Sequence, residues 1–223
     1  TNTTSGITQS RVVQLHVDPI IVPFFTEDWE VASLGSFWSL TGTNTWRTLH
    51  TTDNLPHGGS KHLTMDSSVD GTSARNETTL TLDLTGKQHV RLSFWAKGFS
   101  DEYDGPAPSP FPSTGYDFDG VAISADGGTN WYEVLSLPLP NDWVKYDVDL
   151  DEVKAAHSLT FGTNFKIRFN HYDNFGISTD GMAIDDIVVA ETLTQSIALT
   201  APASVTEGGA SGTVTVTVTP APT

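Results

Sequence analysis

The sequence has 223 residues, which is enough for one large β-domain and part of another. It contains 11 Lys and Arg residues against 27 Asp and Glu residues, and the formal net charge of −16 argues against nucleic acid and anionic lipid surfaces as partners. Cysteine is absent, so disulfides, thiolate chemistry and Cys-based zinc sites are excluded. No stretch approaches the roughly 20 apolar residues of a membrane span, which predicts no membrane insertion. Much Thr, Gly, Asn and Asp with few Lys is typical of a secreted, extracellular protein.

Residues 1–22 are polar and then extended, and we expect a leader or an edge strand there. Further along, nearly every apolar segment is short, alternates with polar residues, and is bounded by Gly, Pro, Asn or Asp, which predicts strands. Many short strands separated by turns indicate a β-sandwich or barrel. The exception is 150–157, which predicts a helical turn or two. The clearest predicted strands are Thr78–Leu84, Val90–Ala96, Gly120–Ser124, Trp131–Leu135, Val144–Val148, Phe165–Phe169 and Met182–Val189.

Two irregular regions interrupt this pattern. Phe99–Tyr116 is a long segment with four prolines and a cluster of acids, and loops of that length in compact domains are usually functional or mobile. Near Leu193–Ser196 the composition changes, and the remaining residues lack aromatic side chains and alternate between Val and Thr over 213–219. We therefore expect one domain over 23–192 and a separate segment over 193–223.

Motifs of known mechanism are few. Ser124–Trp131 (SADGGTNW) fits a single Asp-box, in which Asp126 would cap a tight Gly-Gly turn, so it predicts a hairpin. His57 and His62 flank another Gly-Gly pair, but their spacing matches no zinc-ligand template. The sequence holds no G-x-S-x-G, HExxH, P-loop or dinucleotide motif, so hydrolase and nucleotide-binding functions lack a starting residue.

The doublet Asp185-Asp186 lies inside an otherwise apolar predicted strand. Successive side chains of a strand point to opposite faces, so one of the two should face the interior or an edge groove. A buried carboxylate without a partner is costly. Two partners would remove that cost: a hard cation such as Ca²⁺, which we favour, or one of the arginines Arg75, Arg91 and Arg168.

Aromatic residues are the second candidate set, because sugar C–H faces stack on exposed aromatic rings. Trp38, Trp95 and Trp131 fall in strand-like alternation, which predicts core positions. Four other aromatic residues lie in or beside predicted loops and are the candidates for a carbohydrate-binding face: Trp46, Tyr103, Tyr116 and Tyr172.

From Phe24 to Ala190 the order of motifs resembles the MAM-like, concanavalin A-like jelly roll of exported bacterial multidomain proteins. The cysteines of animal MAM domains are missing. The resemblance implies an all-β, two-sheet antiparallel jelly-roll sandwich. Its motifs are EDWE (Glu27–Glu30), PHGGSKHLTMD (Pro56–Asp66), LSFWAK (Leu92–Lys97), DGVAISADGGTNWYEV (Asp119–Val134) and GMAIDDIVV (Gly181–Val189).

The same resemblance implies two sites. In such domains a structural calcium ion commonly ties the first strand to the last, with ligands here drawn from Asp28, Glu30, Asp66, Asp185 and Asp186. The acidic loop FSDEYDG and the later HYDN would line a second, ligand-binding site formed by Asp101, Asp104, Asp119, Asp173 and Asn174. The last segment, with ASVTEGG followed by TVTVTVT, resembles the opening strands of a Calx-beta domain, cut before it closes.

Three functions remain open from the sequence. The leading hypothesis is a non-catalytic, calcium-stabilised module that binds polysaccharide or a cell-surface glycan, with neighbouring domains of the parent protein as further partners. The second is a purely structural or adhesive spacer. The third is a glycan hydrolase or lyase on a jelly roll, but with so many acids no particular catalytic pair can be chosen.

Overall fold

The computed structural model describes residues 18–177, 179–193, 195–200 and 215–220. The chain divides into a large unit, Ile21–Thr192, and a second unit formed by Thr1–Ile20 together with Leu193–Thr223. The extended stretch Val12–Val17 of the predicted leader lies outside the described residues. Among the described residues, no helix is long and apolar enough to cross a membrane.

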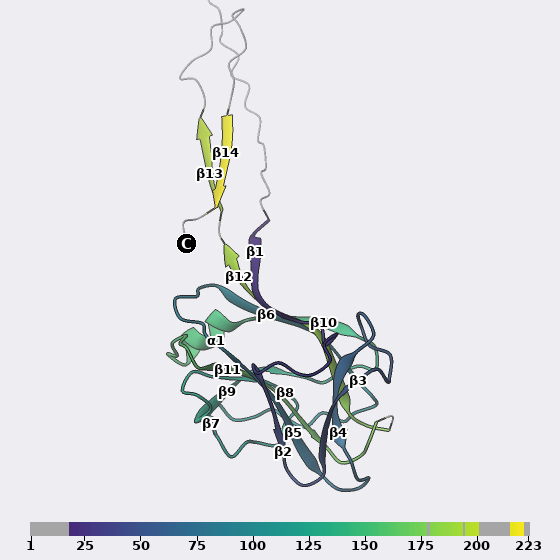
Figure 1. Ribbon diagram of the computed structural model, residues 1–223. Helices are drawn as coiled ribbons and strands as arrows, with labels where there is room; N and C mark the ends of the chain where they lie inside the picture. The colour runs from purple at the N-terminus through teal and green to yellow at the C-terminus, as the bar shows by residue number, and fades with distance from the viewer. Residues whose placement is uncertain (1–17, 178, 194, 201–214, 221–223) are drawn as a thin grey trace, which may run out of the picture. The chain divides into compact units, whose positions relative to one another are not determined.

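The large unit is an antiparallel β-sandwich of two sheets, which confirms the predicted fold class (Figure 1). One sheet has the order β10 (Val144–Asp149), β6 (Val90–Gly98), β12 (Met182–Leu193), β4 (His62–Ser67) and β3 (Trp46–Thr51), and β1 (Ile20–Glu27) also pairs with β12. The other sheet has the order β2 (Trp38–Gly42), β5 (Ala74–Leu82), β11 (Phe165–Asp173), β8 (Gly120–Ser124), β9 (Asn130–Ser136) and β7 (Phe111–Pro112).

The predicted short helix is confirmed as α1 (Leu150–Ala156), directly after β10. Asp149 is its N-cap, and its side chain accepts a hydrogen bond from the backbone N–H of Asp151. The first turn carries Asp151 and Glu152 and the last turn carries Lys154, so the charges match the helix dipole.

The core between the sheets follows the alternation of the strands. On β6 the side chains of Leu92, Phe94 and Ala96 are fully buried, and on β11 those of Ile167 and Phe169 are as well. The remaining large members of this cluster come from both sheets and from the segment after β1, and they include Trp29, Leu63, Met65, Leu80, Val121, Ile123 and Ile184.

Two of the three tryptophans predicted in the core are buried, Trp38 and Trp131. Trp95 is half-buried, and its ring stacks on His57 with ring centres 3.8 Å apart. The prediction was wrong for Trp95 because Leu92, Phe94 and Ala96 occupy the inner face of β6, which leaves position 95 on the outer face.

The Asp-box segment forms the β8–β9 hairpin, as predicted. Asp126 accepts hydrogen bonds from the backbone N–H groups of Thr129 and Asn130. Burial by itself would raise the pKa of Asp126, but hydrogen bonds from Asn130, Ser124 and Thr129 lower it to about 2. The Trp131 ring N–H donates to the Gly128 carbonyl, so this hydrogen bond fixes the tryptophan ring against the turn.

The second unit contains an antiparallel hairpin of β13 (Gln195–Thr200) and β14 (Thr215–Pro220). Its register pairs Gln195 with Pro220 and Thr200 with Thr215. The Val/Thr alternation of the sequence therefore forms a strand over 215–220. The Calx-beta resemblance of this segment stays a prediction.

Candidate functional site

Four aspartates and one histidine meet at one end of the core. Asp101 follows β6 and Asp119 precedes β8, whereas Asp180 lies in the connection to β12. His171 and Asp173 stand on β11, two and four residues beyond Phe169, so the alternation of the strand turns them to the side that faces the core. Strands and connections of both sheets thus supply these residues. We call them the acid cluster: Asp101, Asp119, His171, Asp173 and Asp180.

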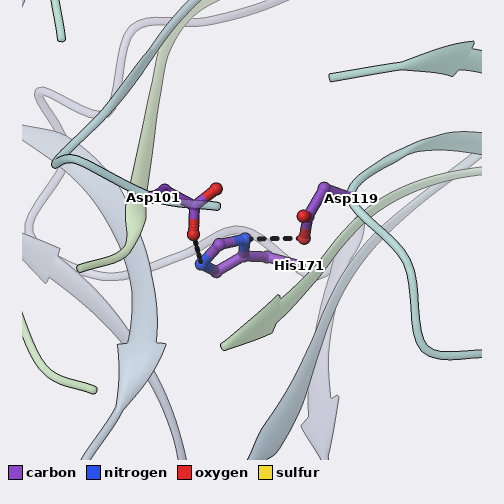
Figure 2. A group of neighbouring side chains, drawn as sticks. All are labelled: Asp101, Asp119 and His171. Carbon is purple, nitrogen blue, oxygen red and sulfur yellow. Dashed lines mark hydrogen bonds and ion pairs between the residues drawn. The ribbon is translucent and has the colours of Figure 1, made fainter. Parts of the chain in front are cut away.

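His171 is at the centre of the acid cluster. Its Nδ1 lies 3.0 Å from Asp119 Oδ1, and its Nε2 lies 3.3 Å from Asp173 Oδ2. The same Nε2 lies 3.6 Å from Asp101 Oδ1, and Figure 2 shows the imidazole between Asp101 and Asp119. The side chain of Asp101 is 1% exposed, and those of Asp119, His171 and Asp173 are fully buried.

The burial of so many acids displaces their protonation equilibria. Burial raises the pKa of Asp101 to about 9, although the neighbouring His171 opposes this. Burial and the nearby Asp173 raise the pKa of Asp180 to about 7. Burial lowers the pKa of His171, but hydrogen bonds to Asp119 and Asp173 outweigh this effect and raise the pKa well above its ordinary value. At neutral pH the histidine is therefore an imidazolium.

The acid cluster also anchors the long loop. The backbone N–H of Asp104 donates to Asp119 Oδ2 over 2.6 Å, and the backbone N–H of Asp119 donates to the Asp104 carbonyl. Tyr103 lies between Asp101 and Asp104, and its side chain is 39% exposed. Tyr116, at the other end of the loop, is 40% exposed. The loop thus has buried acids beneath it and two tyrosines at its surface.

Apart from the exposed Tyr103 and Tyr116, the predicted ligand-binding residues divide into three groups. Asp101, Asp119 and Asp173 meet in the acid cluster, and Asp104 joins them through its backbone. Asn174 is half-buried, and its side-chain oxygen has no hydrogen-bond partner. Trp46 and Tyr172 were predicted at the binding face as well, but both are half-buried; Trp46 packs on Gly42, and the Tyr172 backbone N–H donates to Asp119.

Sequence reasoning missed two members of the acid cluster, His171 and Asp180. His171 stands in the HYDN motif, and its spacing of two residues from Asp173 placed both on one face of an extended strand. This signal was available, but the predicted strand ended at Phe169. Asp180 comes from a different loop, so no local pattern connects it with Asp101.

Three of the five predicted metal ligands meet around one loop, residues 57–61. Asp185 Oδ2 accepts the backbone N–H groups of His57 and Gly58 over 2.9 and 3.1 Å, and Asp186 Oδ2 lies 2.6 Å from His57 Nδ1. Glu30 accepts the N–H groups of the last two residues of the loop over 2.7 Å each. The first and last strands are therefore connected through this loop.

Asp185 and Asp186 reach the same loop although neighbouring strand residues normally point to opposite faces. The pairing of β12 with β6 shifts register between Asp185 and Val188, which marks a β-bulge. Asp186 also has a left-handed backbone, with φ of 46°. The prediction that one acid of the doublet faces the interior is confirmed, since Asp185 is inaccessible to solvent while the Asp186 side chain is 35% exposed. What the sequence did not indicate is the irregular backbone that lets both carboxylates reach the same loop.

The other two predicted metal ligands have different partners. Asp66 forms a bidentate ion pair with Arg47, with contacts of 2.7 and 2.5 Å, and accepts the Ile177 N–H over 2.8 Å. Asp28 Oδ1 accepts the backbone N–H of Glu30 over 3.1 Å. Asp66 is thus neutralised by an arginine. An arginine partner was the alternative to a cation that the sequence left open, but for Asp185-Asp186.

Two glycines of the loop lie against the carboxylates. A Cβ atom added to Gly58 would lie 2.9 Å from Asp186 Oδ2, and one added to Gly59 would lie 2.4 Å from Glu30 Oε1. The two glycines therefore let carboxylates from both ends of the domain approach the backbone closely. Burial raises the pKa of Asp185 to about 6, as expected for a carboxylate that would gain from a bound cation. Glu30, Asp185 and Asp186 are not among the groups of described residues whose ligand atoms all lie within 4.8 Å of one another, so calcium at this loop stays a prediction.

A surface hollow lies elsewhere on the large unit. It is lined by Lys87, Lys154, Leu159 and Phe161 together with neighbouring residues. It contains none of the predicted ligand-binding residues. The two surfaces therefore differ in chemistry. The long loop exposes tyrosines and acids, whereas the hollow is lined by two lysines and an aromatic ring.

No protein-family model and no curated protein matches this sequence. Solved structures do match, and carbohydrate-binding modules with a β-sandwich fold are prominent among them. The N-terminal CBM22 tandem domain of Paenibacillus barcinonensis Xyn10C is 12% identical with a TM-score of 0.45, and the match covers 80% of this chain and 46% of that one. This chain thus spans less than half of that protein's length.

Two further structures cover most of both chains. The family 11 carbohydrate-binding module of the Clostridium thermocellum cellulase Lic26A-Cel5E is 12% identical with a TM-score of 0.43, covering 80% of this chain and 96% of that one. A cyclase from Fischerella sp. TAU is 14% identical with a TM-score of 0.36, covering 78% and 97%. Identities and TM-scores are low throughout, so function has to follow from the residues of this chain.

Proposed function

We propose that the large unit is a non-catalytic module of a secreted protein and binds carbohydrate on the exposed face of the long loop and the two residues after it, residues 99–118. The observation that carries the proposal is the position of Tyr103. Its ring is exposed, while the residues on either side of it, Asp101 and Asp104, are attached to the buried acid cluster.

This arrangement suits a sugar for two reasons. An aromatic ring stacks on the C–H face of a pyranose, and a ring on a fixed backbone loses little conformational entropy when it binds. Glu102 and Asp117 are exposed on the same loop and can accept hydrogen bonds from sugar hydroxyls. Tyr116 adds a second exposed ring at the far end of the loop. The proposed ligand is therefore a polysaccharide that runs along the loop.

The test is a screen of the full chain against soluble polysaccharides and a glycan array, followed by titration of the best ligand. We expect Tyr103→Ala and Tyr116→Ala each to weaken binding about tenfold, which corresponds to ~1.4 kcal/mol. Phe37→Ala is the matched control, because Phe37 is exposed but lies just before β2. Equal binding by all three variants and the wild type would remove the loop from the binding face.

Structural calcium is the second part of the proposal. We propose that it binds at the loop 57–61, held by Glu30, Asp185 and Asp186, and supplies positive charge between the first and last strands. The motifs that resemble MAM-like domains contain these three acids, and the calcium site is proposed for this chain on the basis of that resemblance.

A structural spacer is the second candidate, because Trp29, Trp38 and Trp131 are buried and so are unavailable to a sugar. A folded wild-type chain that binds no polysaccharide in the screen would favour it. A glycan hydrolase or lyase would need titratable acids in contact with substrate, whereas the acids of the cluster are covered by the long loop.

A further inference from the structure

We infer that the acid cluster is a binding site for a hard divalent cation of the calcium type, held by Asp101, Asp173 and Asp180. This site is separate from the loop 57–61, and it does not depend on the proposed carbohydrate ligand.

The first observation is the state of Asp101. Its side chain is 1% exposed and points at the acid cluster (Figure 2), yet neither of its oxygens has a hydrogen-bond partner among the residues that the structure describes. The nearest positively charged atom is His171 Nε2, at 3.6 Å. A buried carboxylate normally accepts two or more hydrogen bonds or coordinates a metal, because an unpaired polar group in the interior costs free energy.

The second observation is the balance of charge. Four carboxylates face one imidazole, and in the described part of the chain no Lys or Arg forms an ion pair with any of the four. Two other buried acids of this protein are neutralised by arginine. Asp66 is paired with Arg47, and Glu77 is paired with Arg75 and Arg168. The acid cluster has no such partner among the described residues, and a divalent cation would supply the missing charge.

The third observation is spacing. One oxygen from each of Asp101, Asp173 and Asp180 lies within 4.8 Å of the others. Oxygen ligands of Ca²⁺ lie 2.3–2.6 Å from the ion, so two of them are at most about 5 Å apart. The three carboxylates therefore fit around one ion with little movement.

The ligand atoms also indicate the class of cation. Both ring nitrogens of His171 face carboxylates, Nδ1 facing Asp119 and Nε2 facing Asp173, so the ring donates on both sides and has no free lone pair for a metal. Asp119 accepts three hydrogen bonds, from His171, Tyr172 and Asp104, and it does not belong to the group formed by Asp101, Asp173 and Asp180. The remaining ligands are all carboxylate oxygens, which suit calcium and not zinc.

A cation here would join three parts of the sandwich. Asp101 starts the long loop after β6, Asp173 ends β11, and Asp180 stands before β12. The ion would thus link both sheets at the end of the core, and it would hold the loop two residues before the exposed Tyr103. This last consequence, that the cation orders the carbohydrate-binding loop, rests on the proposed function.

The test uses the metal-stripped full chain, titrated with Ca²⁺ and followed by calorimetry and by the melting temperature. We expect Asp101→Asn and Asp180→Asn each to bind one calcium ion fewer than the wild type, or to bind that ion at least tenfold more weakly. Asp142→Asn, which removes one charge from an exposed loop residue, should behave as the wild type.

Asn has nearly the same shape as Asp and introduces no charge, so both variants should fold, and circular dichroism checks this. If one of them fails to fold, the other decides. Wild-type stoichiometry and affinity in the folded variants would overturn the inference, and so would a preference of this site for Zn²⁺ over Ca²⁺. The titrations contain no carbohydrate, so an absence of glycan binding would count against the proposed function alone.

Discussion

At the scale of single residues, the burial of His62 makes stability depend on pH. Its side chain is inaccessible to solvent, Nε2 lies 2.6 Å from the Asp53 carbonyl, and Nδ1 has no hydrogen-bond partner. Burial lowers the pKa of His62 from 6.5 to about 4. The folded state therefore keeps the ring neutral while the unfolded state takes up a proton, so stability is complete above pH 6.5 and falls as the pH approaches 4. We expect the free energy of unfolding in urea to include a loss of about 1–2 kcal/mol from His62 between pH 7 and pH 5.

The quantity to compare is the pH dependence of the unfolding free energy in the wild type and in each variant. A comparison is needed because Asp101, Asp180 and Asp185 have raised pKa values, and their protonation stabilises the folded protein as the pH falls. His62→Gln keeps a donor for the Asp53 carbonyl and should lose less stability than the wild type over this range. His89→Gln, at an exposed position, is the control. The same pH dependence in wild type and His62→Gln would contradict the assignment.

Individual site residues were predictable where a local motif named them. FSDEYDG and HYDN contain Asp101 and Asp173, and the structure brings both into the acid cluster. The ion pair of Arg47 with Asp66 was not predictable, because it depends on the register of β3 with β4, which places the two residues opposite each other. Register follows from packing of the whole sheet, and 19 residues of sequence separate this pair.

At the scale of elements, the loop 57–61 is a close fit that a methyl group should disturb. Gly59 has φ of +53°, and an added Cβ would lie 2.4 Å from Glu30 Oε1. Gly59→Ala should therefore cost the left-handed backbone penalty and also displace the Glu30 carboxylate from its bonds to Ser60 and Lys61. We expect Gly59→Ala to lower the unfolding free energy by more than Gly71→Ala does, measured in urea.

Gly71 is the matched control, because it has φ of +77° and no atom within 4 Å of an added Cβ. Its substitution should cost only the backbone penalty, about 1–2 kcal/mol. In a Glu30→Ala background the cost of Gly59→Ala should fall to that of Gly71→Ala. A cost that stays the same in both backgrounds would mean that Glu30 is not the group displaced.

Elements with clear alternation were predicted well, and the others were not. β6, β8 and β10 lie where the apolar period of two predicted them, with ends that differ by at most two residues. β4 was missed although its sequence alternates, with Leu63 and Met65 between His62, Thr64 and Asp66, because only two apolar residues carry the pattern. β11 extends past its predicted end because its last inward positions carry His171 and Asp173 instead of apolar side chains.

At the scale of the whole molecule, a sandwich without cysteine needs other connections between distant parts of the chain. Glu30 and the doublet Asp185-Asp186 come from opposite ends of the large unit, and both contact the loop 57–61. A calcium ion there would stabilise the folded state by mass action, since the unfolded chain has no such site. At a free concentration 100 times the dissociation constant this amounts to about 2.7 kcal/mol.

We therefore expect EDTA to lower the melting temperature of the full chain by about 5 °C or more, as followed by circular dichroism. The experiment belongs in the Asp101→Asn background, because this variant lacks the inferred site in the acid cluster and leaves only the loop 57–61 to respond. Adding Asp185→Asn to that background should abolish the effect of EDTA. If EDTA leaves the melting temperature of the Asp101→Asn variant unchanged, calcium does not bind at this loop. The hydrogen bonds from residues 57–61 to the three acids then join the segment after β1 to β12 without an ion, in addition to the direct pairing of β1 with β12.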